Sequence, residues 1–369
     1  MGYFRDLLKN IDFSLLFMPV IFAAISVVMI GSTSYDTTFH ITREIKVQLI
    51  AYGLGVIAIG LILSFDYKNF QGLEKVLYIG SIVLLLLVYV PGIGVQHFGA
   101  HGWLSIGPLD LQPSEVVKIT FVLSFSNYLT RNRNNLDNLK GLIFAALYFI
   151  PFVVLILIEP DLGNTIVIFV MAAVMLFCAG TKYRLFGEVA GVGLLSLPVL
   201  YRFMADHQKV RIDAFLHPNN LSLPGNYQVW NSKIAIGSGG FFGKGLFQGT
   251  QKELKFLPVQ QSDFIFSVIV EELGFLGGAA VVALYTFFLY RIVKIADNAK
   301  DMYGSLVVIG LLSMFSFQIF ENIAMTMGLM PVTGITLPFI SYGGSSVLTN
   351  MAALGLVLNV GIRSKVINF

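Results

Sequence analysis

The sequence predicts an all-α polytopic membrane protein that crosses the bilayer about ten times, and three observations carry this prediction. Hydrophobic residues make up 56% of the 369 residues and charged residues only 12%, with a mean hydropathy of +0.78. This composition is far too apolar for an ordinary water-soluble domain. Apolar runs of roughly 20 residues, the length that spans the hydrocarbon core, recur along the chain. Lys and Arg gather in alternate connecting segments, as they do in polytopic proteins.

The expected spans lie one after another in a single integral membrane domain of residues 1–369. In order they are Phe13–Gly31, Ile45–Ser64, Val76–Ile93, Ser114–Leu129, Leu142–Ile158, Leu162–Ala179, Leu185–Met204, Asp263–Arg291, Tyr303–Met327 and Val347–Gly361. The fourth is short and less apolar, because it carries Glu115 and Lys118. The first is too long for a removable signal peptide and lacks a small-residue cleavage site, so it should remain as a helix.

The distribution of Lys and Arg orients the chain, because these residues prefer the cytoplasmic side of short loops. With the N-terminus inside, the Lys and Arg of the short loops fall inside, apart from Arg43 and Lys46. The remaining outer cations lie in the long loop 205–262, and long loops translocate largely regardless of charge. We therefore expect both termini in the cytoplasm and the loop 205–262, between the seventh and eighth helices, outside.

Charge and cysteine content narrow the function classes. The net charge of +3 is distributed as membrane insertion requires, and no basic cluster indicates nucleic acid, so no nucleic-acid partner is expected. Cys178 is the one cysteine of the chain, which excludes an intramolecular disulfide.

Arg43 and Lys46 stand at the outer end of the second expected helix. Two interpretations remain open for them: a solvated helix start, or cations that hold an anionic substrate. The loop from Pro91 to Pro113 carries Gly and Pro every few residues, which predicts a compact external loop with turns. Trp103 within it is expected to anchor at the membrane interface.

His97 and His101 in the same loop stand four residues apart. The intervening glycine argues against a helical metal pair, and no third ligand follows nearby. We do not expect a metal site there.

Pro113 and Ser114 start the fourth helix, and Glu115 and Lys118, three residues apart, project from one of its faces. Two interpretations are open for this pair. It is an internal ion pair whose two charges neutralise each other, or it lines a cavity in which Lys118 contacts a phosphate and Glu115 adjusts the electrostatics of Lys118.

The tight link Glu159-Pro160-Asp161 is acidic and is expected on the outside. One interpretation is an exposed turn. The other is that the two carboxylates bind a divalent cation, which prefers oxygen ligands.

The run from Ser232 to Gly245, SKIAIGSGGFFGKG, lies in the long outer loop and is rich in glycine. Glycine permits close backbone approach, as phosphate-cradling loops require. The spacing matches neither the Walker nor the dinucleotide pattern. Lys233 and Lys244 in the same run strengthen the hypothesis of phosphate binding.

The segment Met330–Ser346, before the last helix, is mostly apolar yet broken by proline and glycine. Broken backbone at membrane depth is tolerated only where it is packed in protein or lines a cavity. We therefore expect a re-entrant or interfacial loop beside the site, with Ser341, Gly343 and Gly344 in contact with substrate.

The stretch from Phe256 to Gly274, FLPVQQSDFIFSVIVEELG, carries the strongest site hypothesis, because charged groups at membrane depth are rare unless they line a polar cavity. Asp263 stands at the outer mouth of the eighth span, as a chemical acid or as a helix N-cap. Glu271 lies about 12 Å further along the helix axis. Glu271 and Glu272 are therefore expected to organise the cavity or the helix packing.

These blocks together resemble the shape, elongation, division and sporulation family of bacteria, which includes RodA, FtsW and SpoVE. The matching blocks keep the family's order along nearly the whole chain: Gln112–Glu115 with Lys118, Glu159–Gly163, Ser232 with Ile234–Gly240, Ser262–Phe266 with Glu271–Gly274, Asn322, Gly328–Gly334 and Leu337–Ser346. Two departures are visible. Val259 and Gln261 stand where many relatives have an acid and a His, and Gly102 precedes Trp103 where Arg is common.

The resemblance implies a peptidoglycan glycosyltransferase that polymerises Lipid II on the outer face of the bacterial cytoplasmic membrane. The essential acid of the family aligns with Asp263, and its helix-four acid and base align with Glu115 and Lys118. Family members work with a class B penicillin-binding protein, a transpeptidase that cross-links the new strands, within elongation or division complexes of membrane proteins.

The residues suit this chemistry, because glycosyl transfer from a polyprenyl diphosphate needs a base for the acceptor hydroxyl and positive charge for the leaving group. Asp263 is the expected base, and attack opposite the leaving group inverts the anomeric centre. The expected cationic groups are Arg43, Lys46, Lys118, Lys233 and Lys244. A divalent cation, Mg²⁺ or Mn²⁺, is a further candidate without a defined ligand set, and no organic cofactor is expected.

Two other function classes compete with the polymerase: a Lipid II flippase, which buried charges and broken helices also suit, and a non-catalytic scaffold. The polar groups fall on the outer side rather than at the midplane, which favours the polymerase. Within the family, the short N-terminal tail and the absence of a long C-terminal tail favour the RodA type, active in elongation, over division and sporulation members.

Overall fold

The computed structural model describes residues 11–33, 41–90, 94–97, 100–106, 109–188, 206–250 and 259–364, with the single positions 92, 191, 195, 201, 202 and 204. Most of the seventh expected span, Leu185–Met204, lies outside the described residues. The side chains of His97 and His101 also lie outside them.

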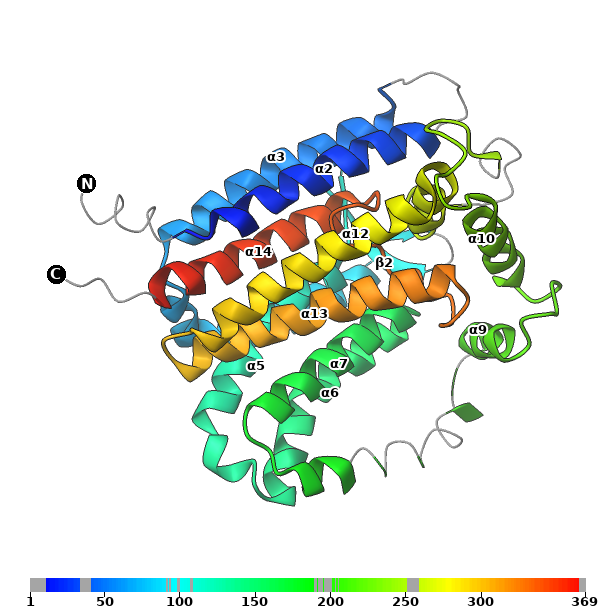
Figure 1. Cartoon of the computed structure of the whole chain (residues 1–369). Coiled ribbons are helices and arrows are strands. Elements are labelled where there is room, and N and C mark those ends of the chain that lie inside the picture. Colours follow the sequence, from blue (N-terminus) through cyan, green and yellow to red (C-terminus); the bar gives the residue numbers. More distant parts are fainter. Residues whose placement is uncertain are drawn as a thin grey trace.

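Long helices form a bundle whose described chain begins and ends on the same side (Figure 1). The α-helices are α2 (Phe13–Thr33), α3 (Arg43–Ser64), α4 (Glu74–Leu86), α5 (Pro113–Arg131), α6 (Leu139–Ile158), α7 (Leu162–Cys178), α9 (Asp206–Leu216), α10 (Asn226–Ser238), α12 (Ile265–Asp297), α13 (Met302–Thr326) and α14 (Gly344–Ser364). Short 3₁₀ helices precede α4 and follow α4 and α5: η1 (Tyr67–Leu73), η2 (Leu87–Tyr89) and η3 (Arg133–Asn135).

Seven segments of the described chain are long and apolar enough to cross a membrane: α2, α3, Tyr67–Tyr89, α6, α12, α13 and α14. α7 is apolar but has only 17 residues, and α5 carries Glu115, Lys118 and Arg131. The chain is therefore a multi-pass helical membrane protein, as predicted. Nine of the ten expected spans coincide with helices, but the described residues do not establish the number ten.

One element departs from the all-α prediction. The loop after α4 contains a three-stranded antiparallel sheet of β1 (Gly94–His97), β2 (Ala100–Ile106) and β3 (Leu109–Leu111). Leu104 is buried, Trp103 is half-buried and Ser105 is exposed, so the middle strand presents different environments on its two faces. This period of two is the strand signal, and the frequent glycines obscured it. Together with α9 and α10, the sheet marks what we term the sheet end of the bundle (Figure 1).

α14 occupies the middle of the bundle between α3 and the pair α12 and α13 (Figure 1). Small residues let it approach α3 closely. A side chain at Gly355 would lie 3.3 Å from the Cα of Ile59, and one at Gly55 would lie 2.6 Å from the Met351 side chain. Close backbone approach of this kind is how helices pack where no hydrophobic effect drives them together.

The segment before α14 passes through the core as broken backbone. Phe339 has a φ of 66° and stacks between Phe22 and Phe315, with ring centroids 5.5 and 5.7 Å apart. Its carbonyl accepts a hydrogen bond of 2.6 Å from Tyr52, and the Pro338 carbonyl accepts one of 2.5 Å from Tyr285. Tyrosine hydroxyls thus hydrogen-bond to backbone carbonyls that would stay unpaired in lipid.

α12 contains a break at Gly274, where φ is 69° and ψ is −167°. The glycine-rich run after α10 fills this break, because Lys244 N and Gly245 N each donate a 3.0 Å hydrogen bond to the carbonyls of Glu271 and Glu272. In the other direction, Phe275 N donates to the Gly240 carbonyl at 2.9 Å. These backbone groups are committed to α12. The amides of Lys244 and Gly245 are therefore not available to a phosphate, and phosphate binding by the rest of the run stays a prediction.

Candidate active site

Asp263 lies at the sheet end, in the turn that leads into α12. Its side chain is half-buried, and the Ser262 hydroxyl donates a 2.9 Å hydrogen bond to its Oδ1. Asn322 Nδ2 donates to its backbone carbonyl at 3.0 Å. The N-cap residue of α12 is Phe264, and no side chain caps the helix there. The alternative interpretation of Asp263 as the N-cap is therefore wrong.

The surroundings of Asp263 make its carboxylate more basic than an exposed one. Burial raises the pKa of Asp263 to about 6, while the Ser262 hydrogen bond and the positive charge of Arg211 act in the opposite direction. A carboxylate with a pKa just below neutral is mostly ionised at pH 7 and still accepts a proton readily. This side chain therefore suits a general base.

A second acid, Glu321 of α13, reaches the same place and was not singled out from the sequence. It is 1% exposed and accepts a hydrogen bond from the Thr333 hydroxyl. Nothing among the described residues donates to its Oε2. The next residue after Thr333, Gly334, has a φ of 80°, and a side chain there would lie 3.6 Å from Asp263 Oδ2. An acid within an apolar helix was the signal that could have found Glu321.

The broken segment before α14 closes on the turn of Asp263. Ser341 Oγ donates to the Ser262 carbonyl at 2.5 Å and accepts from Leu337 N at 2.8 Å. Tyr342 N donates to the Gln261 carbonyl at 2.9 Å. The expected neighbourhood of Ser341 and Asp263 is present, with the Ser341 hydroxyl bonded to backbone.

Gly343 and Gly344 follow at the start of α14. Gly343 N donates to Gln48 Oε1 at 3.2 Å, and Gln48 Nε2 donates to the Ser341 carbonyl at 3.0 Å. Gln48 of α3 thus ties this turn to the bundle. Contact of Gly343 and Gly344 with substrate stays a prediction.

Glu115 and Lys118 form a buried ion pair with an Nζ to Oε1 distance of 2.6 Å, and Lys118 is completely buried. Lys118 also donates to Asn164 Oδ1 at 3.1 Å. Asn164 Nδ2 in turn donates to Asp161 Oδ2 at 2.8 Å, as does Gln112 Nε2 at 2.9 Å. The pair is therefore one end of a polar network that joins the starts of α5 and α7.

This network borders the site of Asp263. Gly163 of α7 packs against the broken segment, since a side chain there would lie 3.1 Å from the Thr333 carbonyl. Asp161 accepts from Asn164 N at 2.9 Å and so caps α7. Its carboxylate belongs to a helix cap rather than to an exposed turn.

Glu159 contradicts the exposed-turn interpretation more strongly. Its side chain is 0% exposed, and nothing among the described residues hydrogen-bonds to either carboxylate oxygen. Gly102 of β2 lies beside the carboxyl, since a side chain there would be 3.7 Å from Oε2, but glycine offers it no side-chain partner. Burial, with the charge of Asp161 adding to it, raises the pKa of Glu159 to about 8.

Replacement of Glu159 by Gln should therefore stabilise the protein at high pH. Because the folded pKa lies above the ordinary value of 4.5, wild-type stability should fall as the pH rises from about 4.5 to about 8. Gln cannot ionise, so the variant should lose this slope and gain more than about 1.4 kcal/mol at pH 9, the value of one pKa unit. Thermal unfolding in detergent at pH 5 and pH 9 measures the effect.

The matched control is Glu188→Gln, which removes an exposed carboxylate 3.0 Å from Arg184. It should leave the pH slope unchanged. Equal slopes in the wild type and in Glu159→Gln would contradict an ionisable buried Glu159.

Glu271 and Glu272 hold the loop after α10 against α12. Glu271 Oε1 accepts from Lys244 Nζ at 2.6 Å and from Thr250 N at 2.9 Å. Glu272 accepts from the Ser32 hydroxyl and, at 3.1 Å, from Phe247 N. The deeper pair of acids thus organises helix and loop packing, and Lys244 is engaged with Glu271.

Arg43 and Lys46 are exposed at the start of α3. Burial raises the pKa of Tyr342, and the nearby positive charge of Arg43 partly offsets it, which places Arg43 beside the broken segment. Trp103 is half-buried on β2, opposite Val95 of β1. Substrate contacts of Arg43 and Lys46 stay predictions.

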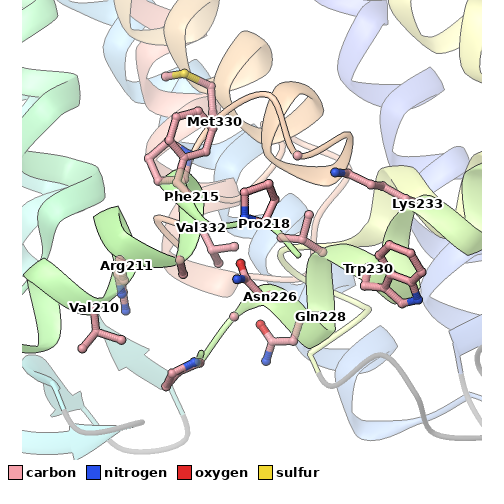
Figure 2. A pocket seen from close by; sticks show the side chains of 16 residues that line it. Val210, Arg211, Phe215, Pro218, Asn226, Gln228, Trp230, Lys233, Met330 and Val332 are labelled. Carbon is pink, nitrogen blue, oxygen red and sulfur yellow. The ribbon is translucent and has the colours of Figure 1, made fainter. Parts of the chain in front are cut away.

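A pocket of about 420 Å³ opens between α9, α10 and the segment 328–332 after α13. Figure 2 shows Arg211 of α9 and Lys233 of α10 on opposite sides of it, with Pro218, Asn226 and Val332 between them. Arg211 was not singled out from the sequence, because nothing in the pattern brought α9 next to Asp263.

Within the described part of the chain, no three His, Cys, Asp or Glu side chains gather so as to hold an ion. The described residues therefore do not define a metal site.

Comparison with known proteins gives consistent matches over most of the chain. The family model FTSW_RODA_SPOVE, described as cell cycle protein, matches residues 12–366. Stage V sporulation protein E of Bacillus subtilis (strain 168) is 35% identical over 368 residues, which cover 96% of this chain and 98% of that protein. Peptidoglycan glycosyltransferase MrdB of Escherichia coli (strain K12) is 35% identical over 326 residues, covering 88% of this chain and 87% of that protein.

Solved structures agree with these matches. A chain of a peptidoglycan synthase complex that coordinates polymerization and crosslinking superposes with a TM-score of 0.83 at 30% identity, covering 96% of this chain and 98% of that one. The rod shape determining protein RodA of Thermus thermophilus superposes with a TM-score of 0.70 at 30% identity, covering 95% and 96%.

Proposed function

Because the chain belongs to the FtsW, RodA and SpoVE family of cell cycle proteins, we propose that it is a peptidoglycan glycosyltransferase that polymerises Lipid II. Relatives over nearly the whole chain bear the name peptidoglycan glycosyltransferase, which supports this activity. One observation of the structure carries the proposal: the half-buried Asp263 carboxylate, with a pKa of about 6, at the sheet end of a membrane bundle.

The reaction joins two lipid-linked disaccharides. Asp263 accepts the proton of the acceptor sugar hydroxyl as that oxygen attacks the anomeric carbon of the donor. The bond from the anomeric carbon to the diphosphate oxygen breaks on the opposite face, which inverts the centre. The diphosphate leaves with the bonding electrons, and positive side chains near the site stabilise its charge.

The sheet end faces the outside of the cytoplasmic membrane in this proposal, with both termini in the cytoplasm. The new strands pass to a class B penicillin-binding protein, whose transpeptidase cross-links them. Similarity to a chain of a complex for polymerization and crosslinking supports such a partner. We further propose the elongation role, in which depletion gives round cells; filaments would indicate a division role instead.

Purified full-length protein with Lipid II tests the activity directly. Glycan strands should form and lengthen with time, without any ATP, and strand length is read on a gel after digestion of the lipid. A parallel reaction with a metal chelator tests the candidate Mg²⁺ or Mn²⁺. Movement of Lipid II across a vesicle membrane without any glycan product would identify a flippase instead of a polymerase. If neither activity were detected, the remaining candidate would be a non-catalytic scaffold.

A further inference from the structure

We propose that the pocket between α9 and α10 binds the diphosphate of a lipid-linked sugar, with Arg211 and Lys233 as its two cations. The inference rests on the proposed function and specifies where the leaving group is held. Both residues line the pocket, and in Figure 2 their side chains lie on opposite sides of it.

Neither cation forms an ion pair with a carboxylate in the part of the chain that the structure describes. Arg211 Nη1 donates to the Thr333 carbonyl at 3.3 Å, and no carboxylate within the described residues forms an ion pair with its guanidinium. Lys233 is exposed and likewise forms no ion pair with a described carboxylate. Gly328, with a φ of 71°, leaves room for the Lys233 side chain, because a Cβ there would lie 2.5 Å from Nζ. Two cations that line one pocket favour a ligand with more than one negative charge.

The outer face of α10 places the pocket at the level of lipid headgroups. Tyr227, Trp230 and Ile234 recur at helical spacing and are 40% or more exposed, whereas Asn231 and Ala235 on the other face are buried. Aromatic and aliphatic side chains in such a stripe are typical of a helix that lies in the membrane interface. Trp230 also lines the pocket, so its mouth opens at this stripe. A diphosphate at the end of a polyprenyl chain lies at the same height.

Asp263 and Arg211 both lie next to the backbone at Thr333 and Gly334. Arg211 bonds to the Thr333 carbonyl, and Gly334 is the residue next to Asp263 Oδ2. Inverting transfer needs the base on the acceptor side of the anomeric carbon and positive charge on the opposite side. The structure supplies the base Asp263 and the cation Arg211 at one backbone segment.

Binding of a fluorescent polyprenyl diphosphate to full-length protein in phosphatidylcholine nanodiscs tests the pocket. Lys233→Met and Arg211→Gln should each weaken binding about tenfold, the loss expected for one charge-assisted hydrogen bond. Lys233→Arg should restore most of it. The matched control is Lys209→Met, because Lys209 lies on α9 beside Asp206 and does not line the pocket. It should bind like the wild type.

Three outcomes overturn the proposal: wild-type affinity in both pocket variants, an equal loss in Lys209→Met, or displacement of the probe by phosphatidylglycerol as effectively as by inorganic pyrophosphate. The last would mean that the pocket is a general site for anionic headgroups.

Failure of the proposed polymerase activity is distinguishable from failure of the proposed diphosphate site. Probe binding that depends on Lys233 without any polymerisation would overturn the activity, and normal polymerisation with an unchanged KM in both variants would overturn the pocket.

Discussion

Replacement of Asp263 by Asn is expected to lower the rate of glycan polymerisation by roughly 10²–10⁴-fold, the usual contribution of a general base. Asn keeps the size of the side chain and still accepts the Ser262 hydrogen bond, which is 2.9 Å long in the wild type. It cannot take up the proton of the acceptor hydroxyl. Polymerisation of Lipid II by purified protein measures the rate, and melting temperature shows that the variant is folded.

The pH dependence of the wild type follows from the same carboxylate. With the pKa of Asp263 at about 6, the rate should rise with pH through about 6 and then level off, because only the ionised form accepts a proton. Ser262→Ala is the matched control, because its hydroxyl lowers the pKa of Asp263. That variant should stay active with its midpoint moved to higher pH. An Asp263→Asn protein that still polymerised Lipid II at the wild-type rate would rule out Asp263 as the base.

Replacement of Lys118 by Met should destabilise the protein by about 3–5 kcal/mol, because it leaves the buried Glu115 carboxylate without its partner. The wild-type pair is 2.6 Å apart, and both side chains are almost fully buried. The double variant Glu115→Gln with Lys118→Met should recover most of this loss, since neither charge then remains buried. Thermal unfolding in detergent measures all three proteins.

Arg184→Met is the control for this cycle, because its partner Glu188 is 3.0 Å away and both side chains are exposed. Exposed pairs contribute little, so its melting temperature should hardly change. A double variant no more stable than Lys118→Met would contradict the burial argument. Activity of the folded double variant then separates the two interpretations of the pair. Full polymerisation would mean that the two charges only neutralise each other. Loss of polymerisation would mean that the pair lines the active site.

Local pattern was enough to predict nine of the expected membrane helices and the position of Asp263 at the mouth of α12. Apolar runs such as Leu139–Ile158 cannot lie anywhere but in lipid or core, so hydropathy alone finds them. The polar turn before α12 was equally visible, because Ser262 and Asp263 interrupt apolar sequence. Strands were missed in β1 to β3, since their short alternation is interrupted by glycine. The break at Gly274 was missed as well, because one glycine within an apolar run is compatible with an unbroken helix.

Contacts between distant segments decided the rest. The sequence pattern indicates Lys244 as a phosphate ligand, but its loop folds onto α12 and its ammonium donates a hydrogen bond to Glu271. The sequence pattern is compatible with an exposed turn at Glu159, but β2 covers its side chain in the structure. Glu321 and Arg211 lie 58 and 52 positions from Asp263 in the chain, and only the folded bundle brings them to it.

Sequence pattern alone predicts a multi-pass helical membrane protein with an acid at the mouth of the helix Ile265–Asp297. Both depend on the local free energy of placing each residue type in lipid or water. The folded arrangement is needed to see which charges are satisfied inside the protein and which are left for a ligand. Each depends on partners far away in the chain, so Lys244 and Lys233, eleven positions apart in one glycine-rich run, take different roles: one is bonded to Glu271, and the other faces the pocket.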